Sequence, residues 1–207
     1  MASRGGPLSV FGAMTILEQA TRDAVATLQQ LSPLQARLDR AAALVGECLT
    51  GGGKLLVCGN GGSAGDSADF ATEFACRFNT DRRPFPAINL AACGSLLTAN
   101  ANDYGVEEMF ARSVRAFGRP ADVLVVLTTS GNSPNILAAL RAAKEAGLHT
   151  IALLGREGGK AAGLAEIEFI VPSQITARIQ EAHRFLLHVL CEMAEAGWLL
   201  KENAEPA

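Results

Sequence analysis

KLLVCGNGGSAGD, residues 54–66, joins a short apolar run to a glycine-rich loop. The run KLLVCG, residues 54–59, has the length and apolar character of a buried β-strand bounded by glycines. Helical spacing begins soon after the loop and predicts a helix over about residues 64–78. In an open parallel sheet, ligands bind where such a loop leaves the carboxyl end of a strand and enters a helix. The same stretch therefore predicts both a fold class and the place of a binding site.

The strand–loop–helix pattern recurs through the rest of the chain. Apolar runs predict four more strands: AINLA (87–91), DVLVVLTT (122–129), HTIALLG (149–155) and IEFIV (167–171). Helices are predicted around these strands, at about 106–117, 134–146 and 176–200, with a weak turn near 160–165. Strands that alternate with helices in this way predict an α/β fold with a five-stranded parallel sheet covered on both faces.

The residues before the first strand have apolar positions at helical spacing from 15 to 49. Ser32 and Pro33 interrupt this spacing, and proline suits the first turn of a second helix, so we expect a helical hairpin. The expected organisation is a flexible N-terminal segment (1–14), a single domain (15–200) and a C-terminal tail (201–207). Within the domain, the hairpin (15–50) precedes an α/β core (54–200).

Composition narrows the function classes. The 207 residues carry a net charge of −3 with a pI near 5.7 and no cluster of Lys and Arg, which argues against a nucleic-acid partner. No apolar run is long enough to span a bilayer, and the N-terminus does not resemble a signal peptide. Five scattered cysteines without a C-x-x-C pair indicate reduced thiols, and hence a cytoplasmic protein: Cys48, Cys58, Cys76, Cys93 and Cys191.

A second loop, VLTTSGNSPNIL (126–137), also leads from a strand into a helix. Either loop alone could be a capped helix start, but four hydroxyl side chains within six residues exceed what capping requires: Thr128, Thr129, Ser130 and Ser133. Hydroxyls and free N–H groups at a helix N-terminus favour phosphate. Neither loop matches a nucleotide P-loop, and the first is not G-x-G-x-x-G, so the pattern favours a small phosphorylated metabolite.

Four separate blocks then resemble one known family: CGNGGSA, ANDYG, TTSGNSPN and TARIQEAHRFLLHVLCE. They look like the phosphoheptose isomerases, which are single sugar-isomerase (SIS) domains, and the resemblance runs from about residue 15 to 198. It implies a three-layer α/β/α sandwich with flavodoxin-like features, assembled as a homotetramer. It also implies conversion of D-sedoheptulose 7-phosphate to D-glycero-D-manno-heptose 7-phosphate through an enediol-type intermediate, the first step towards bacterial ADP- and GDP-heptose precursors.

The resemblance also implies roles for individual residues. The sugar phosphate would be bound by Asn60, Gly61, Gly62, Ser63, Glu73, Asn102, Asp103, Thr128, Thr129, Ser130, Ser133 and Gln180. One zinc ion per subunit would be held by Asp69, Glu73, Gln180 and His188. Isomerisation needs a base that moves a proton between neighbouring carbons, which suits Glu73, and a second proton carrier or a metal ligand, which suits His188. A metal would polarise the carbonyl group as a Lewis acid.

Each of these residues also has a simpler interpretation. Glu73 lies four residues before Arg77 and could form only an ion pair on a helix. His188 lies among apolar residues and taken alone would be a packed histidine, and we interpret His183 as structural. On a continuous helix, Gln180 and His188 would be about 12 Å apart, so one ion could hardly join them within one chain. If both serve one site, a neighbouring subunit supplies one of them, and the active sites lie between subunits.

Asp69 departs from the family pattern, in which a histidine usually binds zinc at this position. Zinc could be retained through the carboxylate, a harder ion such as magnesium or manganese could replace it, or the site could work without a metal. Without a metal, repulsion between the carboxylates of Asp69 and Glu73 would raise the pKa of one of them, which would suit a general acid or base. Asp69 could also simply face solvent. We favour a site with a metal weakly held or absent.

Two other functions compete with the heptose isomerase. A paralogue acting on another phosphosugar would have the same phosphate loops. A non-catalytic SIS adaptor that binds a replication initiator protein resembles these isomerases closely. Glu73 together with Gln180 and His188 argues against the adaptor, because an adaptor needs no base beside a phosphate loop, whereas the changed residue at Asp69 argues for it.

Overall fold

The first predicted strand, β1 (Leu55–Gly59), is buried at all five positions and lies inside a parallel sheet. The structure is a computed structural model that describes residues 14–202. Its strands follow the order β2-β1-β3-β4-β5 and all pair in parallel. The other strands are β2 (Ala87–Asn89), β3 (Val123–Thr128), β4 (His149–Gly155) and β5 (Ile167–Val171). The predicted five-stranded parallel sheet is confirmed.

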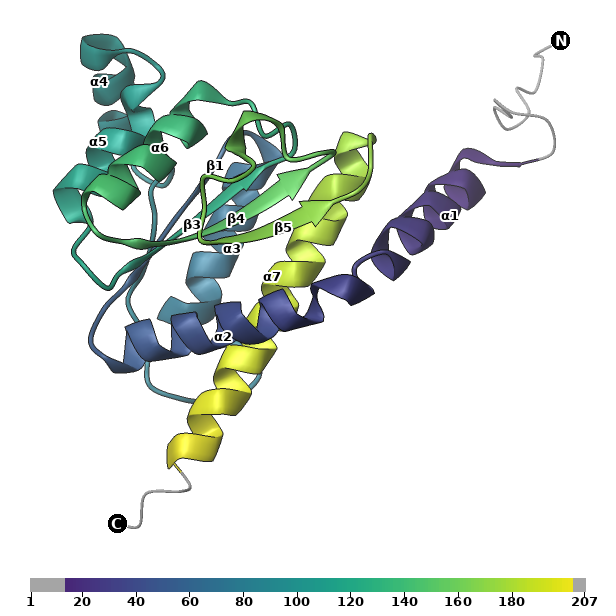
Figure 1. Ribbon diagram of the computed structural model, residues 1–207, viewed down its shortest axis with the longest axis horizontal. Helices are drawn as coiled ribbons and strands as arrows, with labels where there is room; N and C mark the ends of the chain where they lie inside the picture. Colours follow the sequence, from purple (N-terminus) through teal and green to yellow (C-terminus); the bar gives the residue numbers. More distant parts are fainter. Residues whose placement is uncertain (1–13, 203–207) are drawn as a thin grey trace, which may run out of the picture.

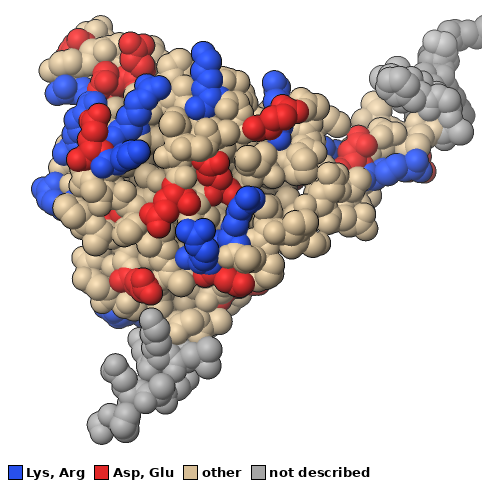
Figure 2. All heavy atoms as spheres, in the orientation of Figure 1, with Lys and Arg blue, Asp and Glu red and all other residues tan. Residues whose placement is uncertain are grey.

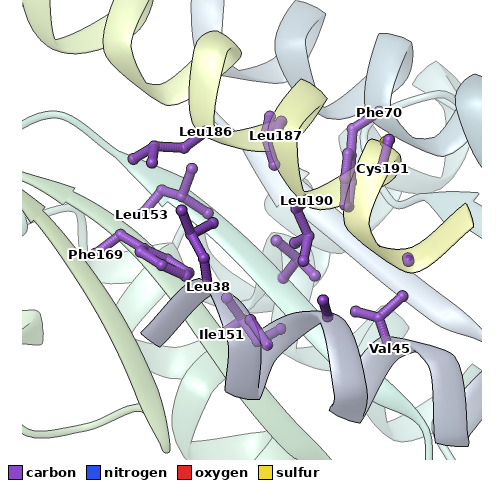
Figure 3. Packing of buried hydrophobic residues seen from close by; sticks show 14 of the residues in the cluster. Leu38, Val45, Phe70, Ile151, Leu153, Phe169, Leu186, Leu187, Leu190 and Cys191 are labelled. Atoms are coloured by element: carbon purple, nitrogen blue, oxygen red, sulfur yellow. The ribbon is translucent and has the colours of Figure 1, made fainter. Parts of the chain in front are cut away.

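Helices cover both faces of this sheet (Figure 1). One layer consists of α2 (Gln35–Thr50), α3 (Gly62–Ala75) and α7 (Thr176–Glu202), and the other of α4 (Gly94–Tyr104), α5 (Glu108–Phe117) and α6 (Pro134–Glu145). Strand β3 shows why both layers form, because Val125 packs with the first layer and Leu124 with the second. Figure 3 shows Leu186 and Leu190 of α7 extending towards the buried side chains of α2 and the sheet, which fixes α7 against the core.

The first helix of the chain projects from one side of the core. Helix α1 (Ile16–Gln29) begins with a capping box, in which the side chains of Thr15 and Glu18 satisfy each other's backbone N–H groups. A short 3₁₀ turn, η1 (Ser32–Leu34), joins it to α2. Figure 1 shows α1 extending away from the body of the molecule. Arg178 of α7 holds it there by donating from Nη1 to the carbonyl oxygen of Ala20 at 2.7 Å.

A buried ion pair fixes the end of α3. Glu195 of α7 is 3% exposed and accepts a hydrogen bond from Arg82 Nε at 3.0 Å. The same guanidinium donates from Nη2 to the carbonyl oxygen of Glu73 and from Nη1 to that of Phe74, which are among the last carbonyls of α3. The contact closes the C-terminal turn of α3 against α7 and holds the two helices in register.

Several predicted boundaries need correction. The helix predicted over 64–78 spans Gly62–Ala75, so Ser63 lies inside it and Gly61 is its N-cap, with φ of +56°. The segment predicted as one helix over 106–117 begins at Glu108, and a separate helix, α4, precedes it. The weak turn near 160–165 is the 3₁₀ turn η2 (Gly159–Ala161).

The expected segment 1–14 and tail 201–207 lie outside the described residues except for Met14, Lys201 and Glu202. In the described range 14–202, no helix is long and apolar enough to cross a membrane. Both signs of charge are interspersed over the face shown in Figure 2.

Candidate active site

The two predicted anion loops meet at the carboxyl ends of the neighbouring strands β1 and β3. Asn60, directly after β1, and Asn135, in the first turn of α6, exchange two hydrogen bonds. Asn60 Nδ2 donates to Asn135 Oδ1 and Asn135 Nδ2 donates to Asn60 Oδ1, each at 2.9 Å. Asn135 is 5% exposed, so these two hydrogen bonds replace those to water that its amide group loses on burial. The loops therefore form one continuous surface.

The conformation of the second loop is fixed by contacts of Gly131 with Gly158 and Thr128. Gly131 has φ of +64°, and a Cβ atom at this position would collide with the carbonyl oxygen of Gly158. Its N–H donates to Thr128 Oγ1 at 3.2 Å, and Thr128 Oγ1 lies 3.5 Å from Ser133 Oγ. Ser133 is the N-cap of α6. These hydroxyls therefore lie at the positive end of a helix, where an anion is stabilised.

Helix α7 packs beside α3 and presents a row of polar side chains to it. Gln180, Arg184 and His188 are spaced by four residues and therefore lie on one face of α7. Gln180 is level with the start of α3, since a Cβ atom at Gly62 would lie 2.6 Å from Gln180 Nε2. A groove of about 270 Å³ between the helices is lined by Gly62, Asp66, Ala177, Gln180, Glu181 and Arg184.

Arg184 is bound by two carboxylates of α3. Its Nε and Nη2 lie 2.9 and 2.7 Å from Asp66 Oδ1, and Nη2 lies 2.6 Å from Asp69 Oδ2. The hydrogen bonds to Asp66 and then to Asp69 raise the pKa of Arg184, so its positive charge is permanent. Although Asp69 is exposed, its carboxylate thus has a specific partner, the guanidinium group of Arg184.

Glu73 and His188 lie further along the two helices. Glu73 is half-buried, and burial together with its nearby carboxylate raises the pKa of the Cys191 thiol, which lies one turn beyond His188. No ion pair between Glu73 and Arg77 occurs among the described residues, so the simpler interpretation of Glu73 is not supported. The ring of His188 packs against that of Phe78, with centroids 5.7 Å apart.

The structure also shows which predicted residues stand apart. Asn102 and Asp103 are exposed at the end of α4, where Asn102 Nδ2 donates to Asp103 Oδ1 at 2.8 Å. Helix α4 belongs to the opposite layer from α3 and α7, and in the described chain no hydrogen bond joins these two residues to either loop. His183 is fully buried with its Nε2 3.1 Å from the carbonyl oxygen of Leu154, which confirms its structural role.

The proposed zinc ligands do not converge within one chain. Among the described residues, no three His, Cys, Asp or Glu side chains lie close enough together to hold a metal ion. Helix α7 is continuous from Thr176 to Glu202, so Gln180 and His188 are separated by about 12 Å along it. Asp69 is already bonded to Arg184. The residues present therefore do not fit a zinc ion in the single chain.

Comparison with known proteins identifies the family of the chain. The family model described as SIS domain matches residues 21–155. A phosphoheptose isomerase of Helicobacter pylori (strain P12) is 47% identical over 167 residues, which cover 81% of this chain and 87% of that protein. The chain belongs to the phosphoheptose isomerase family. A second relative of that name, from Geobacter sp. (strain M21), is 46% identical over 84% of this chain and 89% of its own.

Solved structures of family members have the same fold. The phosphoheptose isomerase of Neisseria gonorrhoeae matches with a TM-score of 0.82 and 40% identity, over 87% of this chain and 97% of that one. That of Francisella tularensis matches with a TM-score of 0.79 and 38% identity, over 86% and 93% of the two chains. The sandwich fold implied by the sequence resemblance is thus confirmed, and the adaptor alternative gains no support from these relatives.

Three site residues were not predicted from the sequence: Asp66, Asn135 and Arg184. Asp66 and Asn135 lie within the two loop-to-helix segments, but their partners are distant in sequence, so no local pattern identifies them. For Arg184, the spacing along the sequence does indicate a place in the site. It lies four residues from both Gln180 and His188, which places it between them on the same face of the helix.

Proposed function

We propose that this chain is an isomerase that converts D-sedoheptulose 7-phosphate to D-glycero-D-manno-heptose 7-phosphate. Family membership over most of the chain supports this, and one structural observation carries it. The hydrogen-bonded pair of Asn60 and Asn135 joins a hydroxyl-rich helix N-terminus to the loop that begins α3, the helix of Glu73. We assign the phosphate group to this helix N-terminus and the base to Glu73, at the two ends of one surface, which suits a linear sugar phosphate.

The phosphate end of the substrate is assigned to the second loop. Its hydroxyls lie at the positive end of α6 and are suited to hold the three phosphate oxygens, through Thr128, Thr129, Ser130 and Ser133. Asn60, Gly61, Gly62 and Ser63 line the sugar beside it. The positive φ of Gly61 lets the backbone turn closely towards the substrate. Binding energy from the phosphate can then orient the reacting end.

The reacting end is assigned to the polar faces of α3 and α7 that carry Glu73, Gln180 and His188. Glu73 removes a proton from C1 of the ketose, a double bond forms between C1 and C2, and the carbonyl oxygen on C2 takes up charge and a proton. The hydroxyl on C1 then loses its proton and becomes the new carbonyl, while Glu73 returns a proton to C2. His188 is assigned the transfer of protons between the two oxygens, and Gln180 the positioning of the hydroxyls. The product is an isomer of the substrate, so no oxidant is needed.

We also propose a homotetramer in which neighbouring copies complete the site. Helix α1 projects from the body and exposes Ile16 and Leu17, which are 61% and 76% accessible (Figure 1). A groove between α1 and the start of α7 is largely apolar and includes Met14 and Ile175. Such a surface favours burial by a second copy. A neighbouring copy is also the expected source of Asn102 and Asp103, which lie away from the loops in their own chain. Free cysteines such as Cys76 and Cys93 agree with a cytoplasmic enzyme.

The test is turnover of D-sedoheptulose 7-phosphate by the purified full chain, followed by NMR for the aldose product. The wild-type chain is expected to form the heptose phosphate, and Glu73→Gln to lose at least about two orders of magnitude in kcat because the base is removed. Other phosphorylated ketoses and aldoses serve as comparison substrates. Preference for one of them would assign the chain to another phosphosugar, and no turnover of any would contradict an isomerase.

A further inference from the structure

The environment of Asp69 differs from that of a metal ligand. Its Oδ2 lies 2.6 Å from Arg184 Nη2, and the same guanidinium is bound through Nε and Nη2 to Asp66, which is 7% exposed. This position on α7 lies between Gln180 and His188. A positive charge therefore already lies among the residues that the family resemblance assigns to zinc.

We propose that Arg184 is the resident cation of this active site, takes the place of a divalent metal, and binds the oxygen atoms at the reacting end of the substrate. The inference rests on the proposed isomerase function. It assigns to a side chain of the protein the group that stabilises negative charge on the substrate oxygens during the reaction. Arg184 would then be a catalytic residue, and Asp66 and Asp69 would be positioning residues that hold its guanidinium group.

Charge explains why the metal would be excluded. A divalent ion on Asp69 would lie beside the fixed positive charge of Arg184 and would be repelled by it. If the ion displaced Arg184, it would leave the buried carboxylate of Asp66 without its partner, which is strongly unfavourable. Either route weakens zinc binding at Asp69, whichever subunit supplies the remaining ligands.

Geometry explains how the guanidinium could act instead. The bonds to Asp66 and Asp69 come from Nε and Nη2, so the two hydrogens on Nη1 are not used by this clamp. The Arg184 side chain is 45% exposed, and it lines the groove together with Gly62 and Gln180. A planar guanidinium can bind two neighbouring oxygens at once, such as those on C1 and C2 of the substrate. Held rigidly by two carboxylates, it would stabilise the charge that develops on these oxygens during proton transfer.

The first experiment measures zinc binding and needs no activity. Isothermal titration of zinc into the chelator-treated full chain compares the wild type with Arg184→Met and with a matched control, Arg115→Met. Arg115 lies in α5 of the opposite layer, is 49% exposed and pairs with Glu108 at 2.6 Å. The wild type and Arg115→Met are expected not to bind zinc, whereas Arg184→Met binds it. Stoichiometric zinc binding by the wild type, or none by Arg184→Met, would overturn the proposal.

The second experiment measures turnover of D-sedoheptulose 7-phosphate in the presence of a chelator. The wild type and Arg115→Met are expected to keep their full rate, and Arg184→Met to lose about 10²–10³-fold in kcat, the usual loss for one donor to a developing oxyanion. Unchanged kcat in Arg184→Met, or loss of wild-type activity on chelation, would overturn the proposal.

A third variant keeps the test decisive if Arg184→Met does not fold. Arg184→Lys retains the charge, so it is expected to exclude zinc like the wild type while losing part of kcat because it lacks the planar fork. Zinc binding by a folded Arg184→Lys protein would contradict exclusion by charge. If the wild type turns over no phosphosugar at all, the proposed isomerase function fails, and the zinc titration still decides whether Arg184 is the resident cation.

Discussion

His183 should make the stability of the protein depend on pH below neutrality. The side chain is fully buried on α7, between the site residues Gln180 and Arg184, and its Nε2 hydrogen bonds to the carbonyl oxygen of Leu154 in β4. Burial lowers the pKa of His183 from 6.5 to about 4, while the hydrogen bond to Leu154 opposes part of this shift. Between these two pH values the imidazole is therefore neutral in the folded chain and protonated in the unfolded chain.

The sign and size of the effect follow from linkage. Between pH 6.5 and about 4 the unfolded state binds one more proton at this residue than the folded state does, so lowering the pH destabilises the fold. One pKa unit is equivalent to about 1.4 kcal/mol, so this histidine alone should remove about 3 kcal/mol over that range. The stability that it contributes is fully present above pH 6.5 and is lost by about pH 4.

Urea unfolding, followed by the fluorescence of the single tryptophan, Trp198, measures this effect in the wild type and in His183→Gln. Glutamine does not titrate and can keep a donor near Leu154. The variant should be less stable at neutral pH, but its unfolding free energy should fall by about 3 kcal/mol less than that of the wild type as the pH is lowered. The carboxylates titrate in both proteins and cancel in the difference. Parallel pH profiles would refute this account of His183.

Three further predictions concern the loops, the core and the assembly. Asn135→Ala should remove both hydrogen bonds to Asn60, which should lower the free energy of unfolding in urea by about 1 kcal/mol and raise KM for the sugar phosphate. An unchanged KM would show that the loops act independently. Glu195→Ala should leave the buried guanidinium of Arg82 unpaired and cost about 3 kcal/mol or more, a loss that Arg115→Met should not reproduce. Leu17→Glu should shift the protein to smaller assemblies in sedimentation experiments, because Leu17 is exposed on α1. The stability of the monomer should change by less than about 0.5 kcal/mol. An unchanged assembly would exclude α1 from the interface.

The sheet was predictable because its strands are buried on both faces. Runs such as LLVC and VLVVL must be continuously apolar when helices cover both sides, and glycines bound them clearly. Helix α4 was not predictable in this way. Its sequence GSLLTANANDY is polar through most of its length, buries only Asn100 and contains residues that favour turns, so apolar spacing does not reveal it.

The loops of the site were predictable, but the contacts between elements were not. Glycines and hydroxyls at strand ends identified both anion loops from local sequence. The partner of Asp69 depends on how α7 packs against α3, and nothing within a few residues of Asp69 specifies this. The same applies to Asn60 and Asn135, which are 75 residues apart. Sequence showed that Asp69 was unusual, and the structure showed what it binds.

The two carboxylates on Arg184 also restrict the order in which such a site can change during evolution. Asp66 by itself accepts two hydrogen bonds from the guanidinium, so an arginine at 184 would find a buried partner before any change at 69. An aspartate arriving first at 69 would instead place a second negative charge beside Asp66 with no cation to balance it. The mutational path therefore has a preferred direction, with Arg184 first and Asp69 second. Reversal must run in the opposite order, because loss of Arg184 alone leaves both carboxylates without their cation.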